Sequence, residues 1–163
     1  MSLLSFCEWL ESTPGSTALR ESAWLWPILE SVHAVGIVLV LGTIWAVDLR
    51  LLGLRMRREP VWDVTQQLLP WTWAGFVFMF STGILLVWSE PLRLYNSPFF
   101  RAKLVLLTLA GLNALMFHVT IYRRVASWGQ APVPPLRARI AGLLSLILWM
   151  GVVAAGRSIG YGP

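Results

Sequence analysis

Two histidines, His33 and His118, are the residues whose type and position best suit chemistry in this sequence. Each falls inside a long apolar stretch, where an ionisable side chain is costly and therefore points to a function. Imidazole is an axial ligand of haem iron, and membrane bundles build cofactor sites from side chains on facing helices. The pair predicts a haem b held by both histidines. The alternative is that each histidine is a hydrogen-bonded structural group or a proton relay.

The two histidines lie at different predicted depths in the membrane, which makes one haem bound by both of them harder to build. At 1.5 Å per residue from the outer ends of their helices, His33 lies about 15 Å deep and His118 about 23 Å deep. Helix tilt could remove much of that difference. Separate haems with other axial ligands are the alternative, and Met79 and Met150 are the candidate ligands, although methionines in such positions usually serve packing.

Four further polar residues could complete the site. Lys103 and Arg157 lie near the ends of apolar stretches, where they could pair with haem propionates or extend to lipid headgroups. Asn113 could hydrogen-bond a neighbouring helix or a cofactor edge. Glu30 precedes His33 by one helical turn, so it could orient that imidazole, exchange protons with the outer aqueous phase, or simply lie in the interface.

Asp48 and Arg50 stand two positions apart near the end of the first apolar stretch. That spacing puts them on different faces of a helix, so they should pair with other elements and form a structural latch on the cytoplasmic side. The single cysteine, Cys7, excludes an intramolecular disulfide and any cysteine-based metal cage. The sequence shows no phosphate loop, dinucleotide fingerprint, zinc-protease motif or serine nucleophile elbow.

Membrane-spanning helices must hold these residues in place. The chain of 163 residues is 56% hydrophobic and 13% charged, whereas soluble domains average about 25% charged residues. A helix that crosses about 30 Å of hydrocarbon needs roughly 20 residues. Four stretches meet this requirement, at about 24–47, 68–88, 103–122 and 140–159. The predicted fold class is all-α, an integral membrane four-helix bundle forming one domain over residues 1–163.

The segments outside these stretches predict shorter elements. Apolar and polar residues alternate at helical spacing over residues 3–11, which predicts a short helix in the outer membrane interface. The break at Thr13-Pro14-Gly15 precedes a second short helix, which Ser16 or Thr17 could cap. The proline-rich segment 129–135 should separate the third span from the fourth.

The basic residues indicate topology. The formal net charge is +5, and most arginines lie between the apolar stretches, so nucleic-acid binding is not expected. Loops one and three are the more positive, which puts both in the cytoplasm and both termini outside. We therefore expect a multi-pass protein of a bacterial inner (cytoplasmic) membrane, in contact with the lipid bilayer. A homo-oligomer is compatible with its small size.

Several motifs resemble one family. The segments EWLESTP from Glu8, ESAWLWPILESVHAVG from Glu21, GTIWAVDLRLLGL from Gly42 and KLVLLTLAGLNALMFH from Lys103 resemble bacterial four-helix membrane proteins of unknown function that carry a DLRLLG box. That family is distantly similar to copper-resistance D membrane proteins and to four-helix b-type cytochromes. The cytochrome likeness implies haem b, electron transfer and a quinone or redox protein as partner. Those cytochromes generally use four histidines for two haems, so two histidines favour one haem.

Three functions follow from these patterns. The leading hypothesis is a haem b-binding membrane electron-transfer protein, acting as a membrane oxidoreductase or one of its subunits. The second is a small transporter or metal-handling protein in which Glu30, His33 and His118 line a path for protons or copper. Sparse methionines and one cysteine make no convincing soft-ligand track for copper. The third is a structural subunit of a larger membrane complex.

Overall fold

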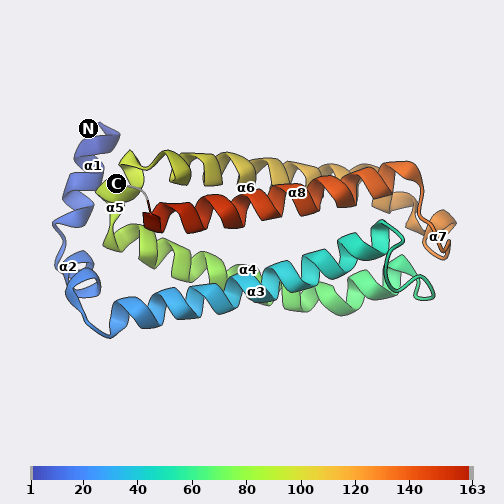
Figure 1. Ribbon diagram of the computed structural model, residues 1–163, viewed down its shortest axis with the longest axis horizontal. Helices are drawn as coiled ribbons and strands as arrows, with labels where there is room; N and C mark the ends of the chain where they lie inside the picture. Colours follow the sequence, from blue (N-terminus) through green and yellow to red (C-terminus); the bar gives the residue numbers. More distant parts are fainter. Residues whose placement is uncertain (1, 162–163) are drawn as a thin grey trace.

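The computed structural model describes residues 2–161 and is helical with no strand over that range. Four long helices run side by side along the molecule (Figure 1). They are α3 (Leu25–Leu51), α4 (Val61–Ser89), α6 (Pro98–Met116) and α8 (Leu136–Ser158). Each belongs to a helical segment long and apolar enough to cross a membrane. The predicted four-helix membrane bundle is therefore confirmed.

The third span does not end with α6. It continues through a π-helical turn (Phe117–Ile121), a 3-10 turn (Tyr122–Arg124) and α7 (Val125–Trp128). A single 3-10 turn, Ile159–Tyr161, likewise extends α8. The proline-rich segment between Trp128 and Leu136 separates the last two spans, as predicted.

The first two helices are longer than the apolar stretches that predicted them. α3 extends to Leu51 where we expected its end at 47, and α4 begins at Val61 where we expected 68. Hydropathy falls where Asp48, Arg50 and the residues from Asp63 to Gln67 enter the sequence, but backbone hydrogen bonding continues through them. Polar side chains can occupy helix ends because those ends lie near the interface or are buried against neighbouring segments.

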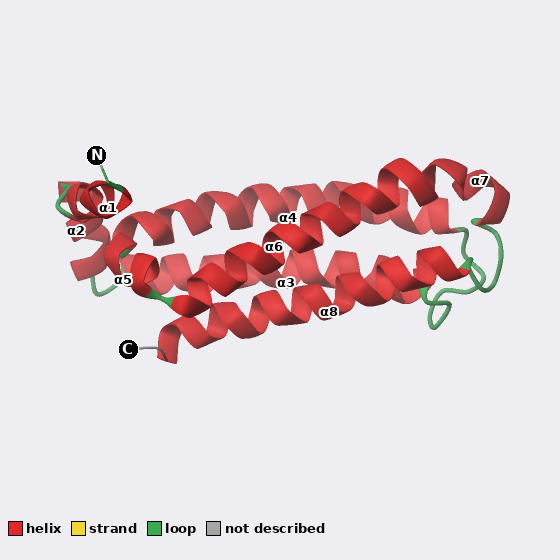
Figure 2. Cartoon of the chain, turned by 90° about the horizontal axis from the view of Figure 1, so that it is seen from above, coloured by secondary structure: helices red, strands yellow, loops and turns green. Residues whose placement is uncertain are grey.

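Short helices cover one end of the bundle, and we call this the α1 end (Figures 1 and 2). They are α1 (Leu3–Glu11), α2 (Pro14–Glu21) and α5 (Pro91–Asn96). The helix expected over residues 3–11 is present. α2 begins at Pro14 with Thr13 as N-cap residue, so the prediction of a cap at Ser16 or Thr17 was wrong. Proline fits the first position of a helix, where its missing N–H has no partner to lose.

The opposite end carries α7 and the loops after α3 and α7, and we call it the α7 end (Figure 1). Between the two ends, α3 packs along α4, α6 packs along α8, and α3 also contacts α8, whereas α4 and α6 are hardly in contact. Glycines allow the close approaches. A Cβ added at Gly75 of α4 would lie 2.8 Å from Cγ2 of Val40, and one at Gly142 of α8 would lie 3.2 Å from the carbonyl oxygen of Asp48.

The middle of the bundle is apolar. Its buried core residues, which we call the central apolar cluster, are Val40, Ala110, Leu148, Trp149 and Val152. A second buried cluster at the α7 end contains Leu51, Val61, Phe117, Val125 and Ala138. The central apolar cluster lies between two groups of polar side chains, one toward each end of the bundle, and separates them.

Candidate functional site

The polar group toward the α1 end is built around His33. Nδ1 of His33 lies 2.8 Å from Oγ1 of Thr82, which joins α3 to α4. The Thr82 hydroxyl lies 2.9 Å from the carbonyl oxygen of Phe78 and donates its hydrogen back to its own helix. With the hydroxyl hydrogen directed to that carbonyl, Thr82 accepts from the imidazole, and in this arrangement Nδ1 carries the proton and Nε2 keeps a free lone pair. This is the tautomer that binds a metal or takes up a proton through Nε2.

Glycine makes room for the imidazole ring. A Cβ added at Gly83 of α4 would lie 3.3 Å from Cε1 of His33, so the ring packs directly on the backbone of α4. One turn further along α3, Gly36 packs against Met79 and Phe78 of α4 in the same way. The ring is half-buried and is held by both contact and hydrogen bond. His33 is therefore a fixed group whose orientation α4 sets.

Lys103 of α6 brings a positive charge to the same region. Its side chain lies over Gly156 of α8, with Nζ 3.5 Å from the position of an added Cβ. At 1.5 Å per residue, Lys103 lies about 8 Å along α6 and His33 about 12 Å along α3, so both lie toward the α1 end, with no hydrogen bond between them. Lys103 is half-buried, and within residues 2–161 it has no carboxylate within 4.0 Å. We call His33, Thr82, Gly83, Lys103 and Gly156 the His33–Lys103 site.

His118 lies elsewhere. It is exposed in the π-helical turn that follows α6, and its Nδ1 is 2.8 Å from the carbonyl oxygen of Ala114 on its own helix. α3 and α6 both begin at the α1 end (Figure 1). His33 lies about 12 Å along α3 and His118 about 30 Å along α6, at 1.5 Å per residue. The structure does not bring the two histidines together, either in depth or in orientation.

The remaining predicted site residues are scattered. Asn113 donates to the carbonyl oxygen of Ala141 on α8 at 3.0 Å. It therefore hydrogen-bonds a neighbouring helix, which was one of its two expected roles. Arg157 is exposed and contacts Tyr161, with a 2.9 Å hydrogen bond to its hydroxyl. Glu30 and Met150 are exposed as well. Within residues 2–161, none of these residues forms a hydrogen bond or an ion pair with the His33–Lys103 site. No group of three or more potential metal-ligating side chains occurs in the same range.

Asp48 and Arg50 form the polar group toward the α7 end, and each contacts a different part of the molecule. Arg50 is fully buried, and its guanidinium donates to the carbonyl oxygens of Glu59 (2.7 Å), Ala131 (3.0 Å) and Gly129 (3.3 Å). It therefore ties the end of α3 to both loops at the α7 end. Asp48 packs against α8 beside Gly142. As the spacing predicted, the two side chains do not pair with each other. Arg50 bonds other segments, whereas Asp48 packs against α8 without a charged partner.

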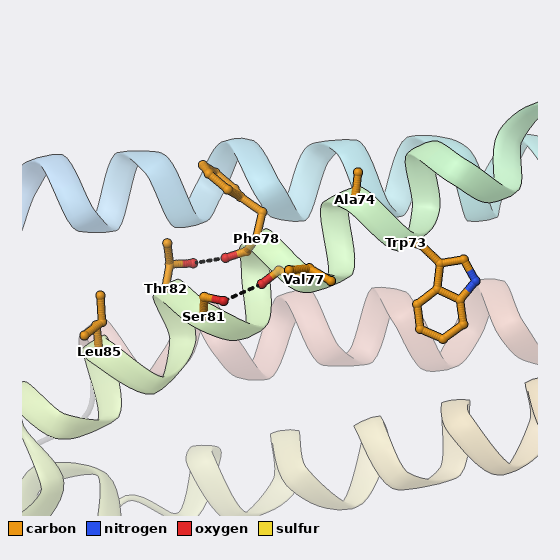
Figure 3. A pocket seen from close by; sticks show the side chains of 7 residues that line it. All are labelled: Trp73, Ala74, Val77, Phe78, Ser81, Thr82 and Leu85. Atoms are coloured by element: carbon orange, nitrogen blue, oxygen red, sulfur yellow. Dashed lines mark hydrogen bonds between the residues drawn. The ribbon is translucent and has the colours of Figure 1, made fainter.

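The exposed side of α4 carries a shallow groove of about 510 Å³ (Figure 3). Its lining residues are Trp73, Ala74, Val77, Phe78, Ser81, Thr82 and Leu85. The hydroxyls of Ser81 and Thr82 donate to carbonyl oxygens one turn earlier in α4, as the dashed lines in Figure 3 show. The groove therefore presents an apolar surface, which suits a lipid chain better than a polar ligand.

Sequence reasoning missed Thr82, Gly83 and Gly156. The available signal was weak, because a threonine or glycine within an apolar helix commonly serves helix packing or bonds its own backbone. Only the rotation of α4 and α8 about their axes decides that these small residues face His33 and Lys103.

The fold and these sites define a four-helix membrane protein with one polar site toward each end of an apolar core. The chain belongs to a family of unknown function, DUF6644, which matches residues 8–162. No curated protein and no solved structure matches it. The expected membership of a family of unknown function is thus confirmed. These comparisons add no support for a likeness to copper-resistance D proteins or b-type cytochromes.

Proposed function

We propose that this chain is a membrane electron-transfer protein that binds one haem b through Nε2 of His33, with the Lys103 ammonium paired to a haem propionate. The observation that supports this best is the hydrogen bond from His33 to Thr82. It fixes the ring orientation, as the hydrogen-bond partners of metal-bound histidines do. The second support is a half-buried lysine of α6 with no acidic partner among residues 2–161.

The residues fit a haem with one protein ligand per chain and do not fit the expected pair of ligands. His118 lies about 18 Å further along the bundle than His33, at 1.5 Å per residue, and is exposed on a different helix. Haem coordination by both histidines of one chain would require the bundle to rearrange. The proposal therefore assigns the axial role to His33 alone.

The chain's own residues would bind and orient the cofactor. A bound haem supplies one-electron redox chemistry at its iron. Thr82 holds the imidazole so that Nε2 stays available, and the glycine at position 83 lets the ring lie against α4. Lys103 offsets the charge of a carboxylate that would otherwise be costly within the membrane. A quinone or a redox protein is the proposed electron partner.

The transporter hypothesis finds less support in the geometry. Glu30 and His118, which were expected to line the path with His33, are both exposed on the outside of the bundle. The central apolar cluster fills the interior between the His33–Lys103 site and Asp48. A continuous polar path would have to pass through these packed side chains, so the arrangement favours a bound cofactor.

We also propose that the α7 end faces the cytoplasm of a bacterial inner membrane. Seven exposed arginines lie in or beside the loops of that end, namely Arg55, Arg57, Arg58, Arg123, Arg124, Arg137 and Arg139. The positive-inside rule then places both termini and the α1 end outside. Cysteine-accessibility labelling of the α1 end and of the α7 end in intact cells tests this orientation.

The experiment that tests the haem proposal is a reduced-minus-oxidised absorption spectrum of the detergent-purified protein, produced with ample haem. We expect haem bands in the wild-type protein, their loss in His33→Ala and their retention in His118→Ala. His118→Ala is the matched control because it removes the other imidazole, which is exposed. A haem-replete preparation without these bands would refute the proposal, and bands lost in both variants would refute coordination by His33 alone.

A further inference from the structure

Asp48 is a buried carboxyl that the proposed haem site does not use. It lies on α3 one turn before the helix ends at Leu51 and is 4% exposed. Its Oδ2 atom is fully enclosed and has no hydrogen-bond partner. About 22 Å of helix, at 1.5 Å per residue, and the central apolar cluster separate it from His33. Asp48 is therefore a separate site.

The wall facing Asp48 is formed by α8 and carries no charge. Gly142 of α8 comes so close that an added Cβ would lie 3.6 Å from Cα of Asp48, and Ser145 of α8 is the polar side chain beside the carboxyl. The charged residues at the start of α8, Arg137 and Arg139, are exposed. α8 therefore offers Asp48 a hydroxyl and no cation.

The other neighbouring elements supply no counter-charge either. Within residues 2–161 no basic side chain comes within 4.0 Å of Asp48. The guanidinium of Arg50, on the same helix, does not reach Asp48: its Nε and Nη2 donate to the carbonyl oxygens of Glu59, Gly129 and Ala131, and its Nη1 has no partner. On α6 the polar side chain in this region is Asn113, which is neutral and bonds the carbonyl oxygen of Ala141.

A lone carboxylate is expensive in such surroundings. Burying an ionised group without a partner costs far more than burying its neutral form, so an unpaired carboxyl takes up a proton instead. The position near the carboxyl-terminal end of α3 adds to this cost, because the backbone dipoles there disfavour negative charge. The enclosure, the missing counter-charge and the helix end thus favour the protonated acid, and a hydrogen bond from the Ser145 hydroxyl offsets only part of that cost.

We propose that Asp48 is a proton-binding site at the α7 end of the bundle. A carboxylate oxygen forms an O–H bond with a proton taken from the aqueous phase at that end, and the folded protein retains this proton at neutral pH. Alkaline conditions return the proton to water and leave a buried carboxylate. The site binds a proton alone, since no cluster of ligands for a metal ion surrounds it within the described residues.

Because the chain contains few aspartates, the protonation state of Asp48 can be measured directly. Asp48 and Asp63 are the two aspartates of the sequence, and Asp63 is exposed at the start of α4. Protein labelled with ¹³C at the aspartate side-chain carboxyl therefore gives two signals, in infrared or NMR spectra, that distinguish acid from carboxylate. At pH 7 we expect one protonated and one ionised carboxyl. Titration to alkaline pH should ionise the first.

Two variants assign the signals. Asp63→Asn should remove the ionised signal and leave the protonated one unchanged. This variant leaves Asp48 and its buried surroundings intact. Asp48→Asn should remove the protonated signal. Two ionised carboxyls at pH 7, or a remaining ionised signal in Asp63→Asn, would overturn the proposal. The measurement uses protein without added haem, so its outcome is independent of the test of the proposed function.

Discussion

Replacement of Arg50 is the most informative test of how the α7 end is held together. Its guanidinium is fully buried and donates to carbonyl oxygens of two loops that are far apart in sequence. Arg50→Gln shortens the side chain and removes these donors. We expect the variant to insert into membranes but to be less stable, because the loops after α3 and α7 lose their common attachment.

The size of the effect follows from the carbonyl groups that lose a partner. The carbonyl oxygen of Gly129 also accepts from the backbone N–H of Val61 at 2.9 Å, so it remains paired. Those of Glu59 and Ala131 lose their guanidinium donor. A buried polar group that loses its partner costs about 1–3 kcal/mol. These two hydrogen bonds are partly buried, so we take about 1–2 kcal/mol for each and expect a loss of roughly 2–4 kcal/mol in the free energy of unfolding.

The assay is reversible unfolding in mixed detergent micelles, followed by far-ultraviolet circular dichroism. Arg55→Gln is the matched control, since the Arg55 side chain is exposed in the adjacent loop and makes no hydrogen bond or ion pair within residues 2–161. We expect the control to lie within about 0.5 kcal/mol of wild type. An Arg50→Gln variant as stable as the control would show that the cost of burying the guanidinium offsets its hydrogen bonds, and the reasoning would fail.

Three further predictions concern the helix contacts and the His33–Lys103 site. Gly75→Val should destabilise the bundle by about 1–3 kcal/mol, because even its Cβ would meet a buried valine of α3 at 2.8 Å, whereas Gly111→Val, with open space around it, should cost much less in the same micelle assay. If haem binds as proposed, Thr82→Val should weaken haem affinity about 10–100-fold in a spectroscopic titration, and unchanged affinity would remove Thr82 from the site. Gly15→Val should displace α2, since its Cβ would lie 2.5 Å from a tryptophan ring of α4, and trypsin should then cleave faster after Arg20 than in wild type.

Hydropathy alone determined most of the fold. Four stretches of about 20 apolar residues must form helices in lipid because no other structure there satisfies the backbone without neighbours. The helix over residues 3–11 and the separation of the last two spans by a proline-rich segment also follow from local pattern. The ends of α3 and α4 do not, since the helical backbone continues into polar residues that only burial against other segments accommodates.

The candidate site residues, too, could be recognised only in part from the sequence. Sequence alone singles out His33, Lys103, Asp48 and Arg50, because ionisable side chains in or beside apolar spans are rare and costly. It also singles out His118 for the same reason, and it cannot show that this imidazole lies on the outside of the bundle. The type of a residue and its depth in the membrane depend on one helix alone, so both can be predicted from the sequence of that helix.

Which residues meet is a property of pairs of helices. The rotation and tilt of α4 relative to α3 bring Thr82 to the imidazole, and the close approach of α8 at Gly142 isolates Asp48 from charge. Both depend on side-chain packing summed over whole helices, in which each contact contributes little. The sequence therefore determined four membrane helices and the rare groups they carry, and only the tertiary structure decided that these groups form two sites with an apolar core between them.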